Sequence, residues 1–340
     1  MLFFDYELPE RLIAQRPADR RDAARLLVVR RDAQELEHRH IRDLPAILNA
    51  GDRIVFNDTK VLPARLIGRR ESTGGKWEGL YLRTLESGEW ELMAKTRGYP
   101  KPGERIVTDN GLSLVLTGRT PDKHWLMRPD ADGPANELLN RYGTIPLPPY
   151  IRKGRADSPD TDRYQTVYAV VPGSVAAPTA GLHFTPELLQ ELEAKGIAQS
   201  RVTLHVGLGT FAPIQSGDPT KHDIHAEWCH VSQDAIAEIA ATRASGGRVI
   251  AVGTTSARSL ESAAASGIPQ AFSGETKLFI HPPFSFRAID GLLTNFHLPR
   301  TTLLLLVQAL AGSELLRRAY EEAIRSEYRF YSYGDAMLII

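Results

Sequence analysis

The chain has 340 residues, with 41 basic and 41 acidic side chains, 42% hydrophobic residues and a single cysteine. This length corresponds to about two domains with a large core, which excludes a disordered protein, a collagen-like fibre and a disulfide-rich miniprotein. One cysteine also excludes an internal disulfide and an all-cysteine metal site.

The first segment, residues 1–59, combines short apolar runs with one helical pattern. Residues 26–29 and 53–58 are predicted strands, and residues 41–51 are a predicted helix between them. The longest apolar run, 303–307, is far shorter than the ~20 residues that span a bilayer. Because the N-terminus shows no basic segment followed by an apolar stretch, we expect a cytoplasmic protein with no membrane contact.

The segment from Val61 to Pro129 is rich in short runs that are typical of β-strands. Turn signals at Ser87-Gly88 and at 109–111 separate these runs, and the pattern predicts a small antiparallel barrel. Residues 60–155 carry 17 basic and 11 acidic side chains, a net charge of +6. This excess favours a surface that faces a polyanion, although charge alone leaves open an ordinary solvated basic face.

After Tyr164, predicted strands alternate with predicted helices. The stretch 145–164 before it is rich in Pro, Arg and Asp and is predicted to be an irregular connector. The alternation predicts an α/β domain into which the barrel segment is inserted. The predicted strands are 200–207, 247–253, 276–280 and 292–296. Three predicted helices follow the capping residues Thr185, Ser232 and Ser313, and another begins at Pro299.

Polar groups follow several of these strands, and open α/β sheets bind ligands at the carboxyl ends of their strands. Gly253 ends one strand, and Thr254 and Thr255 open a helix whose free N–H groups suit an anionic or polar ligand group. Ordinary helix capping is the alternative. Gly207 and Gly209 follow another strand, but the third glycine of a dinucleotide fingerprint is missing, so no Rossmann phosphate loop is expected.

Candidate proton acceptors lie in three of these loops. His183 precedes the helix that follows Thr185, His297 comes shortly after a predicted strand, and Asp58 is a carboxylate at the end of another strand. Imidazole suits general-base chemistry near neutral pH. For His183, a structural histidine with satisfied hydrogen bonds is the alternative interpretation.

A histidine cluster with the cysteine, His222, His225, Cys229 and His230, suggests a zinc site as a competing interpretation. Residues three apart point to opposite faces of a strand, and no second motif completes the site. We therefore expect no metal.

Nine segments, taken in chain order, match one family from end to end. They are FDYELPERLIAQRP, GDRIVFNDTKVLPARL, LPPYI, DRYQTVYA, GSVAAPTAGLHFT, LHVGLGTF, AVGTTSARSLES, LFIHPPFSFRAIDGLLTNFHLPRTTLLLLVQALAG and YRFYSYGDAMLI. The sequence resembles the S-adenosylmethionine:tRNA ribosyltransferase-isomerase family of queuosine biosynthesis (the QueA family). Ala257 stands where the family has valine, and the stretch 70–140 matches only loosely.

The resemblance implies a discontinuous, barrel-like α/β domain, residues 1–60 and 150–340, with a small antiparallel β-barrel inserted at 61–149. It also implies a reaction in which the ribosyl moiety of S-adenosylmethionine moves to 7-aminomethyl-7-deazaguanine at the wobble position of tRNA. The sugar isomerises to give epoxyqueuosine, and adenine and methionine leave. Because no heptad pattern or exposed apolar stripe stands out, we expect a monomer.

This chemistry requires a base for the ribose C–H beside the sulfonium, a cosubstrate pocket and phosphate contacts for the anticodon loop. The candidate bases are His183, His205, Asp58 and His297. The candidate cosubstrate contacts are Gly207, Gly209, Thr210, Gly253, Thr254, Thr255, Tyr331 and Asp335. The candidate tRNA contacts are Arg65, Arg69, Arg70, Arg152, Lys153 and Arg155.

Three other functions compete with this interpretation. A metal-dependent hydrolase would use the histidine cluster. A non-catalytic RNA-binding protein would use the basic barrel, but this leaves the polar strand-end loops unexplained. A conventional methyltransferase would release S-adenosylhomocysteine and no adenine, and the incomplete glycine pattern disfavours it.

Overall fold

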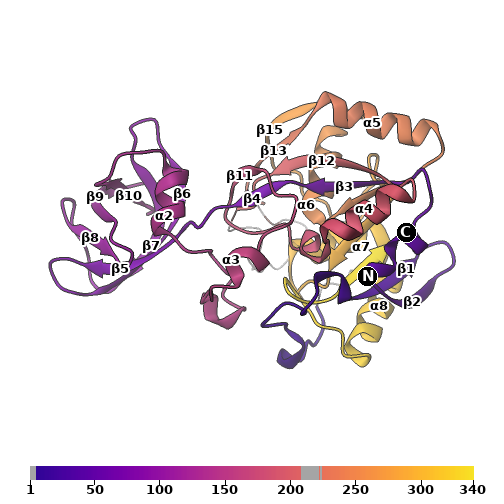
Figure 1. Ribbon diagram of the computed structural model, residues 1–340, viewed down its shortest axis with the longest axis horizontal. Helices are drawn as coiled ribbons and strands as arrows, with labels where there is room; N and C mark the ends of the chain where they lie inside the picture. The colour runs from indigo at the N-terminus through magenta and orange to yellow at the C-terminus, as the bar shows by residue number, and fades with distance from the viewer. Residues whose placement is uncertain (1–4, 208–221, 223) are drawn as a thin grey trace. The chain divides into compact units, whose positions relative to one another are not determined.

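The computed structural model describes residues 5–207, 222 and 224–340. Within this part of the chain, no helix combines the length and the apolar run that crossing a bilayer needs. The chain forms two compact units (Figure 1). The larger unit comprises Met1–Lys60 and Gln165–Ile340, and the smaller unit comprises Val61–Tyr164.

A nine-stranded mixed sheet forms the centre of the larger unit. Its strands in spatial order are β15 (Phe272–Thr276), β13 (Glu227–Val231), β12 (Ala198–Leu204), β3 (Arg53–Asn57), β14 (Val249–Val252), β16 (Gly291–Asn295), β17 (Ala336–Ile339), β1 (Arg25–Arg30) and β2 (Glu35–His40). The four neighbours β12, β3, β14 and β16 run parallel, so their carboxyl ends share one edge. Every residue of β14, β16 and β17 is buried, which explains the apolar sequences of β14 and β17, whereas β16 ends in the buried polar residues Thr294 and Asn295.

Helices cover both faces of this sheet, as the alternation of strands and helices predicts. They are α1 (Leu44–Ile47), α4 (Pro186–Ala194), α5 (Gln233–Ala244), α6 (Thr254–Ala263), α7 (Thr302–Ala311) and α8 (Ser313–Arg325). Alternate residues of each strand enter different cores. Leu27 of β1 shares one core with α5, α6, α7 and α8, whereas Leu26 shares the other with α1 and α4.

Short 3-10 turns and a two-stranded sheet complete the larger unit. The turns are η1 (Glu10–Leu12), η2 (Arg21–Ala23), η3 (Ile41–Asp43) and η5 (Thr179–His183). The predicted helix at 41–51 is thus divided into η3 and α1, which ends at Ile47. The two-stranded sheet pairs β4 (Thr59–Val61) with β11 (Val171–Ser174).

The smaller unit contains a closed six-stranded antiparallel barrel, as the turn-rich sequence predicts. Its strands are β5 (Arg65–Arg70), β6 (Lys76–Thr84), β7 (Trp90–Thr96), β8 (Arg105–Thr108), β9 (Ser113–Arg119) and β10 (Trp125–Pro129), followed by α2 (Ala135–Tyr142). Trp77 and Trp125 meet edge to face in its core, with ring centroids 6.3 Å apart. A Cβ on Gly68 would lie 2.4 Å from the carbonyl oxygen of Val107, so only glycine fits between β5 and β8 there.

Residues 150–164 of the predicted connector 145–164 belong to the smaller unit, whereas the expected division placed them in the larger one. It contains η4 (Arg152–Gly154) and α3 (Asp160–Arg163). Ile151 and Tyr164 are fully buried, so this irregular segment carries apolar anchors of its own. The strand β5 was also not expected, because its arginines mask an alternation of buried and exposed residues.

Helix starts follow the predicted caps at two places out of three. The hydroxyls of Thr185 and Ser232 accept backbone N–H groups at 3.1 Å and cap α4 and α5. Ser313 does not cap α8: Gly312 is the cap residue, and the Ser313 hydroxyl accepts from Gln308 Nε2 at 2.6 Å.

Two other predicted boundaries are wrong. The helix expected at Pro299 begins at Thr302, with Thr301 as its cap. The strand expected at 276–280 ends at Thr276, because the Thr276 hydroxyl accepts the backbone N–H of Leu278 at 3.1 Å and turns the chain.

Candidate active site

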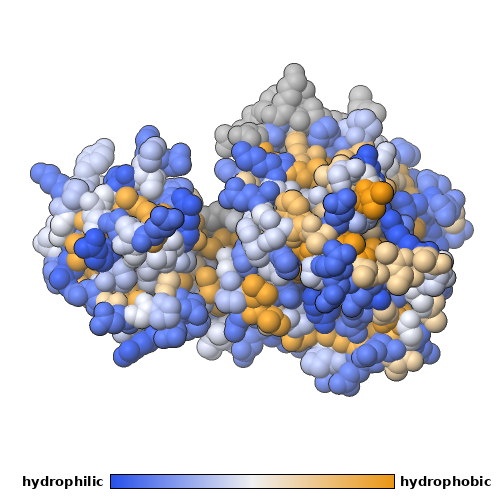
Figure 2. Space-filling view, turned by 90° about the horizontal axis from the view of Figure 1, so that it is seen from above, coloured by the Kyte–Doolittle hydropathy of each residue, from blue (hydrophilic) through white to orange (hydrophobic). Residues whose placement is uncertain are grey.

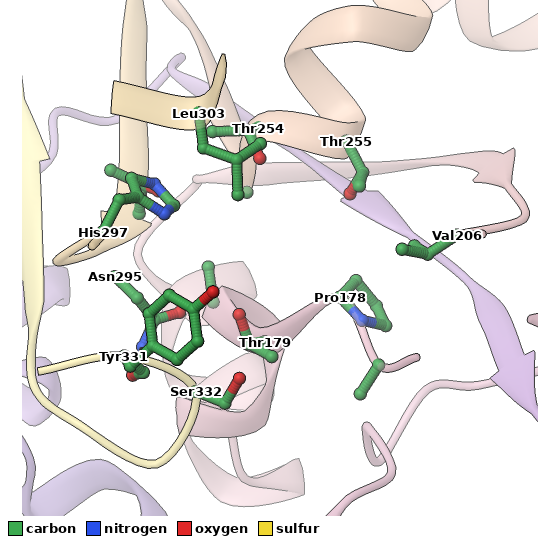
Figure 3. A pocket seen from close by; sticks show the side chains of 14 residues that line it. Pro178, Thr179, Val206, Thr254, Thr255, Asn295, His297, Leu303, Tyr331 and Ser332 are labelled. Atoms are coloured by element: carbon green, nitrogen blue, oxygen red, sulfur yellow. The ribbon is translucent and has the colours of Figure 1, made fainter. Parts of the chain in front are cut away.

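A cavity of about 460 Å³ opens in the larger unit beyond the carboxyl ends of β14 and β16 (Figure 3). Ligands of α/β sheets bind at this position. Its lining residues are Ala177, Pro178, Thr179, Ala180, Val206, Gly253, Thr254, Thr255, Thr294, Asn295, His297, Leu303, Tyr331 and Ser332.

Two buried oxygen atoms in this wall, Thr255 Oγ1 and Asn295 Oδ1, have no hydrogen-bond partner among the described residues. The amide nitrogen of Asn295 donates to His183 Nε2 at 3.3 Å. It also lies 3.2 Å from the carbonyl oxygen of Tyr331 and 3.4 Å from that of Asp335. These three acceptors fix the orientation of the Asn295 side-chain amide. Its oxygen, Oδ1, therefore remains able to accept a hydrogen bond from a ligand. Because buried polar atoms almost always have partners, the two oxygens indicate a ligand that donates hydrogen bonds.

His297 supplies the only imidazole among the described residues of the wall. Its Nε2 lies 2.9 Å from the hydroxyl oxygen of Thr294, and its backbone N–H donates to Tyr320. Burial lowers the pKa of His297 to about 3, because the charged imidazolium would lose its hydration. The ring is therefore neutral at pH 7, and it is a weaker base than a free imidazole.

The aromatic ring of Tyr331 forms another part of the wall (Figure 3). Its backbone has a φ of +74°, a left-handed conformation that bulky residues rarely adopt. Strained residues of this kind cluster at functional sites, where the surrounding structure holds them. Here the Tyr331 N–H donates to the carbonyl oxygen of Phe296 at 3.0 Å, and the N–H of Gly334 donates to Tyr331 at 2.8 Å.

The start of α6 opens onto the same cavity. Gly253 is the cap residue with a φ of +86°, and Thr254 and Thr255 form the first turn. The first N–H groups of a helix have no partner within the helix and favour electron-rich ligand atoms. Both threonine side chains are buried, so these N–H groups and hydroxyls face the cavity rather than open solvent.

The described lining of the cavity combines apolar side chains with several polar groups and carries no charge at neutral pH. Its described lining contains hydroxyl, amide, phenol and imidazole groups and no carboxylate, lysine or arginine. Such walls suit a hydrogen-bonding ring system such as a nucleoside better than a phosphate, since a buried anion needs a cation beside it. Across residues 5–207, 222 and 224–340, no three His, Cys, Asp or Glu side chains are grouped so that they could hold a metal ion.

Comparisons with known proteins place this chain in a family. The sequence profile of a family described as "Queuosine biosynthesis protein" matches residues 2–339. The chain belongs to this family. The match spans both units, so the inserted barrel is part of the family pattern as well as the α/β unit.

Relatives in this queuosine biosynthesis family are similar along their whole length. A Symbiobacterium thermophilum protein named S-adenosylmethionine:tRNA ribosyltransferase-isomerase is 52% identical, covering 99% of this chain and 98% of the relative. A Moorella thermoacetica protein with the same name is also 52% identical with the same coverage. A crystal structure of S-adenosylmethionine tRNA ribosyltransferase from Thermotoga maritima is 37% identical, with a TM-score of 0.57 and 99% of each chain covered.

The structure brings together five of the residues that the sequence selects for the queuosine family site. Gly253, Thr254, Thr255, His297 and Tyr331 all line the cavity. Two further selected residues, Gly209 and Thr210, lie outside the described residues. Gly207 is described but does not line the cavity, and its N–H donates to Glu227 Oε1 at 2.9 Å.

Asp335 and His183 lie behind the wall rather than in it. The Asp335 carboxylate accepts the backbone N–H groups of Arg25 at 3.0 Å and Arg329 at 2.8 Å, so it anchors the turn that carries Tyr331. His183 is 5% exposed and lies beneath Asn295. Burial lowers the pKa of His183 to about 4, so the ring is neutral at pH 7 and one of its nitrogens carries no proton. Because the Asn295 amide nitrogen can only donate, Nε2 is the accepting nitrogen.

His205 and Asp58 form a separate cluster at the ends of β12 and β3. His205 Nδ1 lies 2.8 Å from the Thr59 hydroxyl, and the His205 ring stacks on Trp228 with centroids 5.0 Å apart. The Thr203 hydroxyl donates to Asp58 Oδ1 at 2.7 Å. Burial lowers the pKa of His205, although the nearby Asp58 carboxylate opposes this shift. Neither side chain lines the cavity.

The histidine and cysteine cluster does not converge on one point within the described residues. On β13, Cys229 is fully buried while His230 on the next position is exposed, as expected from the alternation of a strand. Burial raises the pKa of the Cys229 thiol to about 11, so the thiolate that a metal requires is disfavoured.

The six predicted tRNA contacts fall into two groups on the smaller unit. Three make internal ion pairs: Arg65 with Glu78 at 2.8 Å, Arg70 with Glu104 and Arg152 with Asp160. The other three, Arg69, Lys153 and Arg155, are exposed.

Sequence reasoning assigned no role to several wall residues. Asn295 was visible only as a polar residue at a strand end, and Thr179 and Ser332 stood in segments without periodicity. An asparagine at the end of the strand GLLTN could have indicated a site residue, because packing of a buried strand does not require an amide.

Replacing His183 with asparagine should flatten the acid dependence of stability. Between its pKa of about 4 in the fold and the ordinary 6.5, only the unfolded chain takes up a proton, so stability falls as the pH falls. From pH 7 to pH 5, wild type should lose about 2 kcal/mol more free energy of unfolding than His183→Asn, measured by urea titration. His225→Asn, at an exposed histidine, should keep the wild-type slope. Parallel slopes for wild type and His183→Asn would contradict the buried neutral imidazole.

Proposed function

We propose that the protein is an S-adenosylmethionine:tRNA ribosyltransferase-isomerase of queuosine biosynthesis. It transfers the ribosyl moiety of S-adenosylmethionine to 7-aminomethyl-7-deazaguanine at the wobble position of tRNA and isomerises it to epoxyqueuosine, with release of adenine and methionine. Full-length similarity to proteins of that name supports the reaction. The observation that carries the site is the cavity with two unpartnered buried oxygens, Thr255 Oγ1 at the start of α6 and Asn295 Oδ1 at the end of β16.

The cavity residues fit the nucleoside part of S-adenosylmethionine. The carbonyl oxygen of Asn295 and the hydroxyl of Thr255 can accept hydrogen bonds from hydroxyl or amino groups, and the Tyr331 ring offers an aromatic surface. When bound, the sulfonium makes the adjacent ribose C–H acidic. An uncharged wall suits this cation-bearing ligand, since no arginine or lysine in the described lining repels it.

His297 is the proposed general base. Its ring lies in the wall and is neutral at pH 7, the form that can take up a proton, although burial has lowered its pKa to about 3 and makes it a weaker base than a free imidazole. The hydroxyl of Thr294 on Nε2 orients the ring. His183 is a positioning residue, because it touches Asn295 rather than the cavity.

Changing His297 to asparagine should slow the reaction by about 10²–10⁴-fold, the usual contribution of a general base. The assay supplies S-adenosylmethionine and tRNA that carries the aminomethyl base, and it measures free adenine and methionine. His230→Asn, at an exposed histidine on β13, should retain wild-type release. Near-normal release by His297→Asn would remove it as the base. Wild-type protein that forms S-adenosylhomocysteine and no adenine would be a methyltransferase instead.

We further propose that the exposed cations Arg69, Lys153 and Arg155 of the smaller unit contact tRNA phosphates. This unit carries 17 basic and 14 acidic side chains, and hydrophilic residues cover most of its face in Figure 2. Arg65, Arg70 and Arg152 are less suited to this role, because carboxylates already hold their guanidinium groups.

Reversing both Lys153 and Arg155 to glutamate should weaken tRNA binding most at low salt. Each lost phosphate contact should lower the slope of log affinity against log salt by about 0.7–0.9. Lys195→Glu, at an exposed lysine of the larger unit, provides the control and should keep the wild-type slope. An unchanged affinity and slope in the double variant would place the RNA surface elsewhere.

We also propose that the protein acts as a monomer in the cytoplasm. Both proposed substrates, tRNA and S-adenosylmethionine, are found there. The one cysteine, Cys229, is buried and forms no disulfide, which suits a reducing compartment. Light scattering should give a mass near the chain's 37.7 kDa. A dimer mass at micromolar concentration would contradict the monomer.

A further inference from the structure

A second cavity of about 350 Å³ lies beside the first in the larger unit. Leu303 lines both cavities, so the two cavities are adjacent. The walls of the second cavity include the apolar residues Phe279, Ile280 and Leu306. They also include a pair of oppositely charged residues, which the first cavity lacks among its described residues.

The charged pair is Glu227 on β13 and Arg258 on α6. Their side chains are only 3% and 5% exposed, and Arg258 Nη1 donates to Glu227 Oε2. Burying two charges carries a desolvation penalty that one ion pair often fails to offset. A buried ion pair that lines a cavity therefore indicates a role in function rather than in stability.

Arg258 has a donor group without an acceptor. Its Nε donates to the carbonyl oxygen of Leu278 at 3.2 Å, and its Nη1 is taken by Glu227. Its Nη2 is buried and has no hydrogen-bond partner among the described residues. Guanidinium carries five N–H donors in a planar fork that matches a carboxylate. The unmet Nη2 indicates an acceptor that a ligand brings into the second cavity.

The two cavities share one helix face. Thr255 and Arg258 are three residues apart on α6, and residues with this spacing lie on the same side of a helix. Thr255 lines the first cavity and Arg258 the second. One ligand that follows α6 would place hydrogen-bonding groups beside Thr255 and a charged end beside Arg258.

We propose that Arg258 and Glu227 bind the α-amino-acid end of S-adenosylmethionine, with the carboxylate at Arg258 and the ammonium group at Glu227; this subsite rests on the proposed function. The pair selects a zwitterion because its own charges sum to zero. A phosphate or a dicarboxylate would meet the Glu227 carboxylate as well as the arginine and would be repelled. Phe279, Ile280 and Leu306 suit the methylene groups between sulfur and the charged end.

Ligand analogues test the subsite on unmodified protein. Isothermal titration calorimetry compares S-adenosylmethionine with decarboxylated S-adenosylmethionine, which keeps the sulfonium and the amine but lacks the carboxylate. The decarboxylated ligand should bind at least tenfold more weakly, because Arg258 Nη2 then stays unpartnered. Equal affinities would overturn the proposal.

The variant Arg258→Lys keeps the charge beside Glu227 but removes the planar fork. It should bind S-adenosylmethionine at least tenfold more weakly, while its affinity for 5′-methylthioadenosine, which lacks the amino-acid end, should change less than twofold. A matched control is Arg248→Lys, since Arg248 pairs with the buried Asp52 at 2.6 Å and lines neither cavity. The Arg248→Lys variant should bind S-adenosylmethionine and 5′-methylthioadenosine with wild-type affinity. Equal weakening of both ligands by Arg258→Lys would make Arg258 a structural residue and overturn the subsite.

The outcomes separate this proposal from the proposed function. Wild-type protein that binds no S-adenosylmethionine and releases no adenine contradicts both. Wild-type protein that releases adenine but binds the decarboxylated ligand equally well contradicts the subsite alone.

Discussion

The larger unit depends on the burial of one polar helix. Every residue of α6 is buried, although its sequence TTSARSLESA contains only three apolar residues. A buried polar atom without a partner is costly, so each group on this helix needs an acceptor or a donor nearby. The surrounding strands and loops supply them. The fold around α6 is therefore constrained by hydrogen bonding as much as by packing.

The two halves of α6 meet this constraint differently. In the second half, the Glu261 carboxylate accepts the backbone N–H groups of the loop 287–289, at 2.9 Å for Ala288, and Ser262 bonds the hydroxyl of Thr276 at 2.6 Å. Burial raises the pKa of Glu261, yet these N–H groups still favour its charged form. In the first half, Thr255 and Arg258 keep unpartnered atoms. One half thus anchors the helix, and the other faces the two cavities.

Local sequence patterns predicted the elements but not the pairings between distant segments. Gly253 and the hydroxyl residues after it identify the start of α6, and alternation with turn signals identifies the barrel. By contrast, Glu227 precedes Arg258 by 31 positions, and His183 lies beneath an asparagine 112 positions later. Such contacts depend on strand order, which periodicity does not encode. The ion pairs of Arg65 and Arg70 were missed for the same reason.

Both ends of the chain are needed to hold the cavity wall. Tyr331 keeps its strained backbone only because the following turn is fixed, and Asp335 fixes that turn by accepting the N–H of Arg25 from β1. The neighbouring residues Leu26 and Ala336 then begin the parallel pairing of β1 with β17. The strain at Tyr331 is therefore balanced by contacts that close only when the first and last strands have paired. The part of the wall that Tyr331 forms is thus held by contacts between the first and last strands of the sheet as well as by the central strands.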